Sequence, residues 1–273
     1  MPFDLNGTTA IDLALQADRF YAALIRTAGS DAEPNLGGKL LYAGELDAEG
    51  RALIVAANIA GAASLAATAE PAAQKQAIRD GVADFLVTSL DEALRILKNE
   101  IRKRETVAVC VAAAPDEVQH EMLQRGVLPN LLRPGATAGR ECAKFLSQGA
   151  QQIQLFDLDE NQTLLAWSVA SAPAQWLPKL DAIALNCLDG NKGAPGLDSE
   201  TWESARRWLR LSPRYLGRLA QNQRVLRCNK ESAQKFLKQL REQVEQGEVK
   251  VPVEIRLTNL SQTEQQIISP PTS

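Results

Sequence analysis

The sequence is poor in the side chains that bind metals or form disulfides. It has one histidine, His120, and its four cysteines lie more than 30 residues apart without a C-x-x-C pair. Structural zinc sites and disulfide frameworks need closely spaced cysteines and histidines. We therefore expect no metal site and no disulfide, which is typical of a protein of the reducing cytoplasm.

Long apolar runs and an excess of one charge are also missing. The 273 residues include 30 Lys plus Arg and 33 Asp plus Glu, which gives a net charge of −3. No run approaches the roughly 18 apolar residues of a membrane-spanning helix, and residues 1–6 have neither the basic nor the apolar part of a signal peptide. The composition argues against a membrane protein and against nucleic acid as a partner. It favours a cytoplasmic globular chain whose small-molecule ligand the sequence does not identify.

What the sequence does contain is an alternation of short apolar segments with amphipathic stretches. We expect helices over residues 9–28 and 90–104, where apolar residues recur at helical spacing and Ser89 with Glu92 forms an S-x-x-E capping box. Short strands are expected at residues 39–43, 63–67, 85–87, 107–111, 130–132 and 152–156. Strands that alternate with helices predict βαβ units, and so a Rossmann-like parallel sheet with helices on both faces.

The character of the chain changes after Gly149. All four tryptophans lie in this second part, among segments that are mostly helical in pattern. The predicted fold class is therefore α/β, with a second, smaller and helix-rich α+β domain. We predict an N-terminal helix packing on the core in residues 1–35, a Rossmann-like domain in 36–149, the second domain in 150–268 and a loose tail in 269–273.

The turn after the first strand decides whether a dinucleotide fits. Rossmann domains that bind one have a G-x-G-x-x-G turn there, because the backbone must approach the pyrophosphate at the start of a helix. Here the turn, residues 44–51, reads GELDAEGR and lacks that pattern. Its acids Glu45, Asp47 and Glu49 are opposed only by Arg51, so we expect anions to be repelled from this turn.

Four segments of the first half stand out because they occur together and in a fixed order. They read GKLLYAG at residues 38–44, IAGAASLA at 59–66, TSLDEALR at 88–95 and QRGVLPN at 124–130. In this order they resemble the NAD-binding domain of the urocanase (urocanate hydratase) family. The resemblance implies a Rossmann-like fold over about one hundred residues, NAD as the cofactor of the family, and a homodimer.

The same resemblance shows which cofactor contacts this chain has lost. The glycine-rich phosphate turn of the family falls on residues 45–53 and its ribose-binding acid falls on Thr68, so neither is kept. The vestigial cofactor-binding positions that the resemblance implies are Gly44, Gly50, Thr68, Glu70 and Glu117. We therefore expect no bound cofactor, and the resemblance leaves NAD as the alternative.

The second half resembles the catalytic core of the same family more faintly. The reactive cysteine of the family falls on Gly217, and its RDHLDSG segment falls near residues 257–263, where the arginine, acids and histidine are missing. We therefore expect no catalytic residue. The leading hypothesis is a degenerate urocanase-like protein without hydratase activity that acts by binding or assembly. The alternative is an enzyme with a rebuilt site between the two halves that uses NAD or another nucleotide.

An arginine-rich segment, residues 206–227, carries seven positive charges and no acid. Arg206, Arg210, Arg214 and Arg218 are spaced by four and fit one stripe of a helix, although Pro213 favours a break in it. One interpretation is a site for an anion, namely a carboxylate, a phosphate or RNA. The other, which the slightly acidic chain favours, is a solvated face balanced by acids of the other domain or of a second subunit.

Overall fold

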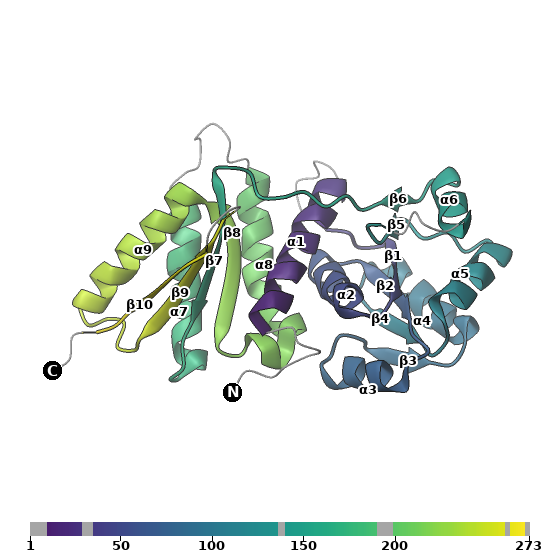
Figure 1. The fold of residues 1–273 in the computed structure, drawn as a ribbon, viewed down its shortest axis with the longest axis horizontal. Helices are drawn as coiled ribbons and strands as arrows, with labels where there is room; N and C mark the ends of the chain where they lie inside the picture. Colours follow the sequence, from purple (N-terminus) through teal and green to yellow (C-terminus); the bar gives the residue numbers. More distant parts are fainter. Residues whose placement is uncertain (1–9, 29–34, 136–139, 190–198, 260–262, 271–273) are drawn as a thin grey trace. The chain divides into compact units, whose positions relative to one another are not determined.

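The computed structural model describes residues 10–28, 35–135, 140–189, 199–259 and 263–270 (Figure 1). Contacts within the chain divide it into two units: Arg19–Phe156 forms the first, and Ala10–Asp18 with Asp157–Ser273 forms the second. The helix α1, Ala10–Ala28, therefore contributes residues to both units. The predicted boundaries near residues 35 and 149 stay predictions; the contacts divide the chain inside α1 and after Phe156.

The first unit contains a six-stranded parallel sheet in the order β3-β4-β2-β1-β5-β6. The order of the strands reverses at β1, because β2 follows on one side of it and β5 lies on the other. The strands are β1 (Leu40–Glu45), β2 (Ala63–Ala67), β3 (Phe85–Val87), β4 (Ala108–Val111), β5 (Leu131–Leu132) and β6 (Gln151–Gln152). The strand predicted over residues 152–156 is instead β6, Gln151–Gln152, which overlaps the prediction only at Gln152 and pairs with Leu131 and Leu132 of β5.

Helices cover both faces of this sheet, which confirms the predicted fold class. Side chains of α4, α5 and α6 share one apolar cluster with β1 and β2, whereas α2 contacts these strands without entering that cluster and so lies on the other face. The helices of this unit after α1 are α2 (Ala48–Ala60), α3 (Pro71–Arg79), α4 (Leu90–Lys103), α5 (Pro115–Gln124) and α6 (Arg140–Ser147).

The start of α4 shows how local sequence fixes an element. The Ser89 hydroxyl accepts a hydrogen bond from the Glu92 amide at 3.3 Å, as the capping box predicts. The Glu92 carboxylate accepts a hydrogen bond from the amide of Thr88 at 3.0 Å, whereas a capping box would use the amide of Ser89. Asp91 and Glu92 also place negative charge at the positive end of the helix dipole.

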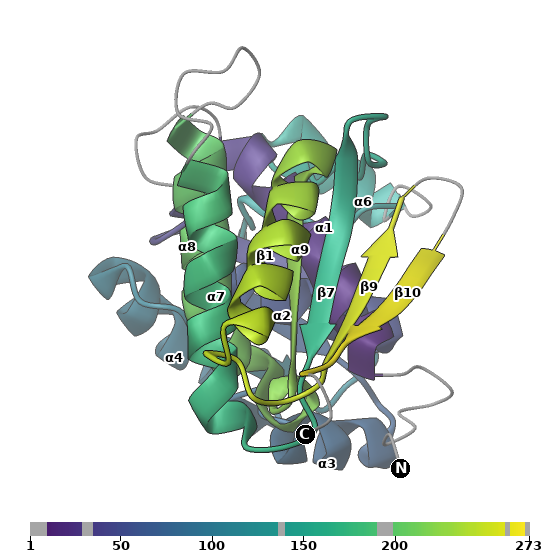
Figure 2. The same cartoon turned by 90° about the vertical axis from the view of Figure 1, so that its left-hand side faces the viewer.

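The second unit contains a four-stranded antiparallel sheet in the order β10-β9-β7-β8. Figure 2 shows α9 lying across this sheet, and Trp167 of β7 packs against Phe236 of α9 with ring centroids 5.3 Å apart. The elements are β7 (Gln162–Ser168), α7 (Pro173–Asp189), α8 (Ser199–Leu216), η2 (Gly217–Ala220), β8 (Gln223–Asn229), α9 (Lys230–Glu245), β9 (Val253–Thr258) and β10 (Thr263–Ile268). The predicted second domain is thus confirmed as an α+β arrangement with its own core. Among the described residues, no helix is both long enough and apolar enough to cross a membrane.

Candidate cofactor site at the carboxyl edge of the sheet

The place to look for a ligand in the first unit is the edge between β1 and β5. Open α/β sheets bind ligands beyond the carboxyl ends of their strands, at the point where the strand order reverses. Here β1 ends at Glu45 and β5 ends at Leu132. The turn that leads from β1 into α2 and the first residue after β5, Arg133, therefore line the expected site.

Arg133 occupies this site with three polar contacts. Its guanidinium donates to the Asp47 carboxylate at 2.9 Å, to the Glu49 carboxylate at 2.8 Å and to the backbone oxygen of Glu45 at 3.2 Å. The side chain of Arg133 is 16% exposed. Burial alone lowers the pKa of Arg133, but the hydrogen bonds to Asp47 and Glu49 outweigh it and raise that pKa. The guanidinium thus stays charged and is engaged by the protein itself.

Arg51, the cation expected to oppose these acids, points elsewhere. It forms an ion pair with Asp80 at the end of α3, and Asp80 also accepts a hydrogen bond from Gln76 at 2.9 Å. The side chain of Arg51 is only 9% exposed. The prediction that Arg51 balances the acids of the turn is therefore wrong, because that role falls to Arg133, which lies 86 residues beyond Asp47 in sequence.

The two glycines kept at the turn have structural reasons. A Cβ added to Gly50 would lie 2.1 Å from the backbone oxygen of Glu45, so only glycine allows α2 to approach β1 this closely. Gly44 has a φ of +68°, just after an irregularity in the pairing of β1 with β2 at Tyr42 and Gly44. A glycine there avoids the strain of a left-handed backbone. Neither position needs a ligand to explain it.

The other vestigial positions lie between a strand and the following helix or in a first helical turn. The Thr68 hydroxyl, at the end of β2, accepts from the Glu70 amide at 3.3 Å, and the Glu70 carboxylate accepts from the Ala72 amide at 3.3 Å, where it caps α3. Glu117 is exposed in the first turn of α5. Thr68 and Gly44 reach the same edge of the sheet because β1 and β2 are neighbours.

Acids begin each helix that follows a strand along this edge. The amide of Gly50 in α2 already donates to the Asp47 carboxylate at 2.8 Å. A helix start attracts anions because its amides and its dipole are positive there, and here the protein supplies that negative charge itself. The acids are Asp47 and Glu49 at α2, Glu70 at α3, Asp91 and Glu92 at α4, Asp116 and Glu117 at α5, and Glu141 at α6.

Tyr42 is a residue of this edge that the sequence did not single out. Its hydroxyl donates to the backbone oxygen of Pro115 at 2.8 Å, so it ties β1 to the start of α5. Burial, and after it the nearby carboxylates of Asp116, Glu45 and Glu141, raise the pKa of Tyr42, which keeps the phenol protonated. A tyrosine among the buried residues of β1 was the available signal.

Residues 20–162, a little over half of the chain, match the family model of the urocanase Rossmann-like domain. The chain belongs to the urocanase family. The match ends at Gln162, so it spans the parallel sheet and its helices, and it confirms the resemblance of the first half. A Rossmann-like domain is a fold compatible with NAD binding.

The structure describes only some of the positions at which the urocanase resemblance predicts that catalytic groups are lost. Gly217, at the position of the family's reactive cysteine, begins η2 with a φ of +53°. Residues 260–262, within the degenerate segment at 257–263, lie outside the described residues. All four cysteines are free and buried, and within the described ranges no group of histidine, cysteine or acidic side chains could hold a metal ion.

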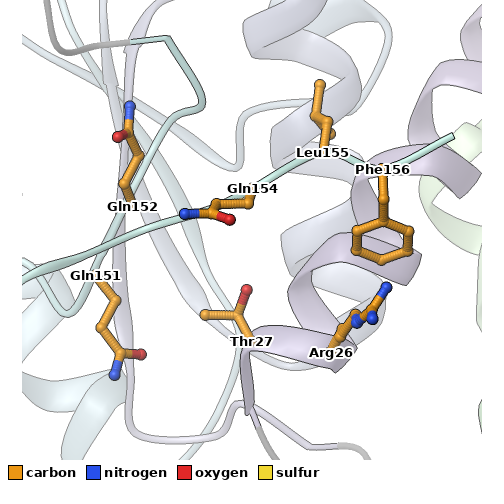
Figure 3. A pocket seen from close by; sticks show the side chains of 7 residues that line it. All are labelled: Arg26, Thr27, Gln151, Gln152, Gln154, Leu155 and Phe156. Carbon is orange, nitrogen blue, oxygen red and sulfur yellow. The ribbon is translucent and has the colours of Figure 1, made fainter.

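A hollow of about 630 Å³ lies beside the end of α1 in this urocanase-family chain. Figure 3 shows the Gln154 side chain lying along the segment that carries Gln151 and Gln152, and the Phe156 ring next to Arg26. The guanidinium carbon of Arg26 lies 4.5 Å from the centroid of that ring. The hollow is lined by Arg26, Thr27, Gln151, Gln152, Gln154, Leu155 and Phe156. Its lining mixes carboxamides and a hydroxyl with a guanidinium and apolar side chains, and no sequence pattern indicated this hollow.

The structure sorts the arginine-rich segment into two groups. Arg224 and Arg227 are half-buried in β8 and form ion pairs with Asp181 at 3.2 Å and with Asp18 at 3.1 Å. Arg206, Arg210 and Arg214 are exposed on α8, which runs unbroken through Pro213. The break favoured by Pro213 is therefore absent. The side chain of Arg218 lies outside the described residues.

Proposed function

We propose that this urocanase-family chain is a degenerate relative whose dinucleotide site is closed by its own ion pairs. In this proposal it does not hydrate urocanate and acts by binding or assembly. The observation that carries the proposal is the guanidinium of Arg133, held between the carboxylates of Asp47 and Glu49 where the pyrophosphate of a dinucleotide would lie. The vestigial positions Gly44, Gly50, Thr68, Glu70 and Glu117 serve the fold in this proposal.

The residues at this edge do not fit NAD. A bound pyrophosphate needs amides at a helix start and a backbone that it can approach closely. The Gly50 amide is taken by Asp47, and an incoming phosphate would meet the carboxylates of Asp47 and Glu49. Like charges at contact distance in partly solvated surroundings repel by about 1 to 4 kcal/mol. Displacing the carboxylates instead would break both ion pairs and the helix cap.

The cofactor part of the proposal is tested by titrating the full chain with NAD and with ADP. Isothermal titration calorimetry and thermal shift should give no response up to millimolar nucleotide, whereas an NAD-binding dehydrogenase in the same buffer should respond. A micromolar affinity would overturn the closed site and favour the alternative, an enzyme with a rebuilt site that uses NAD or another nucleotide. Hydratase activity is tested separately by the ultraviolet absorbance of urocanate, which should stay constant with the protein and NAD present.

The double variant Asp47→Asn, Glu49→Gln separates charge from shape at this site. Asn keeps a good N-cap for α2, while the two substitutions free the Arg133 guanidinium. We expect the variant to gain a measurable, salt-sensitive response to ADP that the parent lacks. Loss of the response on adding Arg133→Gln would assign it to this guanidinium. If the variant gave no response to ADP, the missing glycines of the turn would be what prevents nucleotide binding.

Assembly as a homodimer belongs to the same proposal and is supported by the family to which the chain belongs. The chain has a mass of 29.6 kDa. Sedimentation velocity at micromolar concentrations should show a species of twice that mass. A monomer at these concentrations would contradict assembly and leave binding of another molecule as the proposed role.

A further inference from the structure

The outward face of α8 carries three arginines in one line. Arg206, Arg210 and Arg214 are four residues apart, and four residues of an α-helix advance about 6 Å and turn by little more than one full turn. All three side chains are exposed. The opposite side of α8 is anchored in the core by side chains such as Trp208, whose ring nitrogen donates to the backbone oxygen of Val225 at 2.6 Å. The arginine face is therefore fixed in its outward direction.

Among the described residues of their own unit, none of these three arginines has a recorded ion pair with an acid. Arg224 and Arg227 each have an acidic partner, but the structure records no ion pair for Arg206, Arg210 or Arg214 within the described ranges. An interior role is excluded by their exposure. Balance by acids of the second unit itself thus has no support among its described residues.

Two of the three guanidinium groups are held by aromatic rings. Arg206 lies over Trp202 at 5.2 Å, and Arg214 lies near the ring of Tyr215 at 5.3 Å. A guanidinium that packs on a ring keeps its N–H donors and its second face available, and it loses less freedom when it binds a further group. The residue type also matters, because residues 199–227 contain arginine but no lysine. Arginine binds phosphate with two parallel hydrogen bonds and stacks on bases, whereas lysine acts as a point charge.

From this arrangement we infer that the stripe of Arg206, Arg210 and Arg214 binds the phosphate backbone of a single-stranded nucleic acid. The rise of about 6 Å between successive arginines is close to the separation of neighbouring phosphates along one strand. An acidic peptide is the competing partner, because its carboxylates also bind arginine with two parallel hydrogen bonds, but it has no bases to stack on the free guanidinium faces. The inference does not depend on the closed cofactor site, because it uses another element of another unit.

The test is the fluorescence anisotropy of labelled oligo(dT) and oligo(U) of 20 nucleotides with the full chain at low salt. Binding through three phosphates should weaken with salt with a slope of about −2 in log K against log [salt]. Changing all three residues, Arg206→Gln, Arg210→Gln and Arg214→Gln, should reduce the affinity at least about tenfold and flatten that slope. The corresponding three Arg→Lys changes should keep the slope and lose part of the affinity.

The matched control lies on α4, where Arg95, Lys98 and Arg102 are also exposed on a helix. Changing these three to Gln alters the net charge by the same amount and should change the affinity by less than twofold. Equal losses in both triple variants would show an effect of net charge and overturn the inference, as would no binding by the parent. Circular dichroism of all variants checks that they are folded.

Two further outcomes would also overturn it. Poly-L-glutamate that competes as well as oligo(dT) at equal charge would assign the stripe to acidic proteins. If the parent formed an oligomer that was lost in the α8 triple variant and kept in the α4 triple variant, the stripe would be a contact between copies of this chain.

Discussion

Single residues of the first unit show that a motif position can be kept for packing after its ligand contacts have gone. Gly50 allows the start of α2 to approach the backbone oxygen of Glu45, and Asp47 occupies the amide that a phosphate would use. Glycines in such turns serve two purposes in dinucleotide-binding proteins, close approach of the ligand and close packing of helix on strand. Only the packing purpose is visible here.

Gly50→Ala should therefore destabilise the protein although alanine is the better helix former. Its Cβ would lie 2.1 Å from the Glu45 oxygen, and overpacking of this kind costs about 1 to 3 kcal/mol. Urea unfolding measures the loss. Gly44→Ala is the comparison, because no atom lies within 4 Å of its added Cβ and only the strain of φ +68° remains. A gain of stability in Gly50→Ala would contradict the close approach.

Asp181 gives the second unit a pH dependence of its own. Burial, opposed in part by Arg224, raises the pKa of Asp181 from 3.8 to about 6. The folded state then binds a proton more tightly than the unfolded state, so this contribution is present below pH 4 and is lost as the pH rises through 6. Relative to Asp181→Asn, the parent should lose up to about 3 kcal/mol between pH 4 and 7.

Unfolding in urea at several pH values measures this difference between parent and variant. The exposed Asp159 of the same unit provides a control, since its side chain makes only a local contact with the Asn161 amide at 2.8 Å. The loss between pH 4 and 7 should be larger relative to Asp181→Asn than relative to Asp159→Asn. A flat difference for Asp181→Asn would show that burial does not disfavour its charge.

The candidate site could be predicted from sequence only where its contacts are local. The acids of the turn and the loss of its glycines are visible within residues 44–51, and so is the cap at α4. Arg133 was missed because its partners are 84 and 86 residues away, and only the pairing of β5 with β1 brings them together. Arg51 was given the wrong partner for the same reason, since proximity in sequence favoured the acids beside it over Asp80.

At the scale of elements, α8 shows that a proline does not always end a helix. Pro213 lies three residues before the end of α8, Ser199–Leu216. Only the last turn of the helix follows it, so few backbone hydrogen bonds depend on continuing the helix beyond the proline. Patterns of apolar residues located the strands of the parallel sheet well, because buried strands are short and continuous in such sheets. They misplaced β6, which covers Gln151–Gln152 instead of residues 152–156, because it forms only where β5 offers partners.

Pro213→Ala should stabilise the second unit by about 1 to 2 kcal/mol. The change restores a backbone donor within α8 and removes a residue that disfavours helix by about 3 kcal/mol, while the unfolded chain gains some entropy. Thermal unfolding followed by circular dichroism measures the change. A lower melting temperature would indicate that the proline ring makes packing contacts that outweigh its effect on the helix.

At the scale of the whole molecule, the second unit depends on a segment from the far end of the sequence. Asp18 of α1 pairs with Arg227 of β8, and the side chain of Asp18 is only 4% exposed. Removing one partner of a buried pair leaves the other charge without compensation, which costs about 3 to 5 kcal/mol. Asp18→Asn should therefore destabilise the second unit strongly.

Hydrogen exchange resolves where this loss occurs. Amides of β7 in the second unit should lose protection in Asp18→Asn, whereas amides of β2 in the first unit should keep theirs. The double variant Asp18→Leu, Arg227→Met removes both charges of this pair, so neither is left buried without its partner. It should be more stable than the single variant. If the single and double variants were equally unstable, the effect would come from packing around α1 instead of the ion pair.

The pairing of Asp18 with Arg227 also has a consequence for the order in which a newly made chain can fold. Domains fold as their residues leave the ribosome, from the N-terminus onward. The parallel sheet is complete once Gln152 has been made, but Asp18 must wait for a partner 209 residues further along. During that interval the first turns of α1 have no second unit to pack against. A chain arrested before β8 would therefore expose the first turns of α1, although the Rossmann-like unit is already formed.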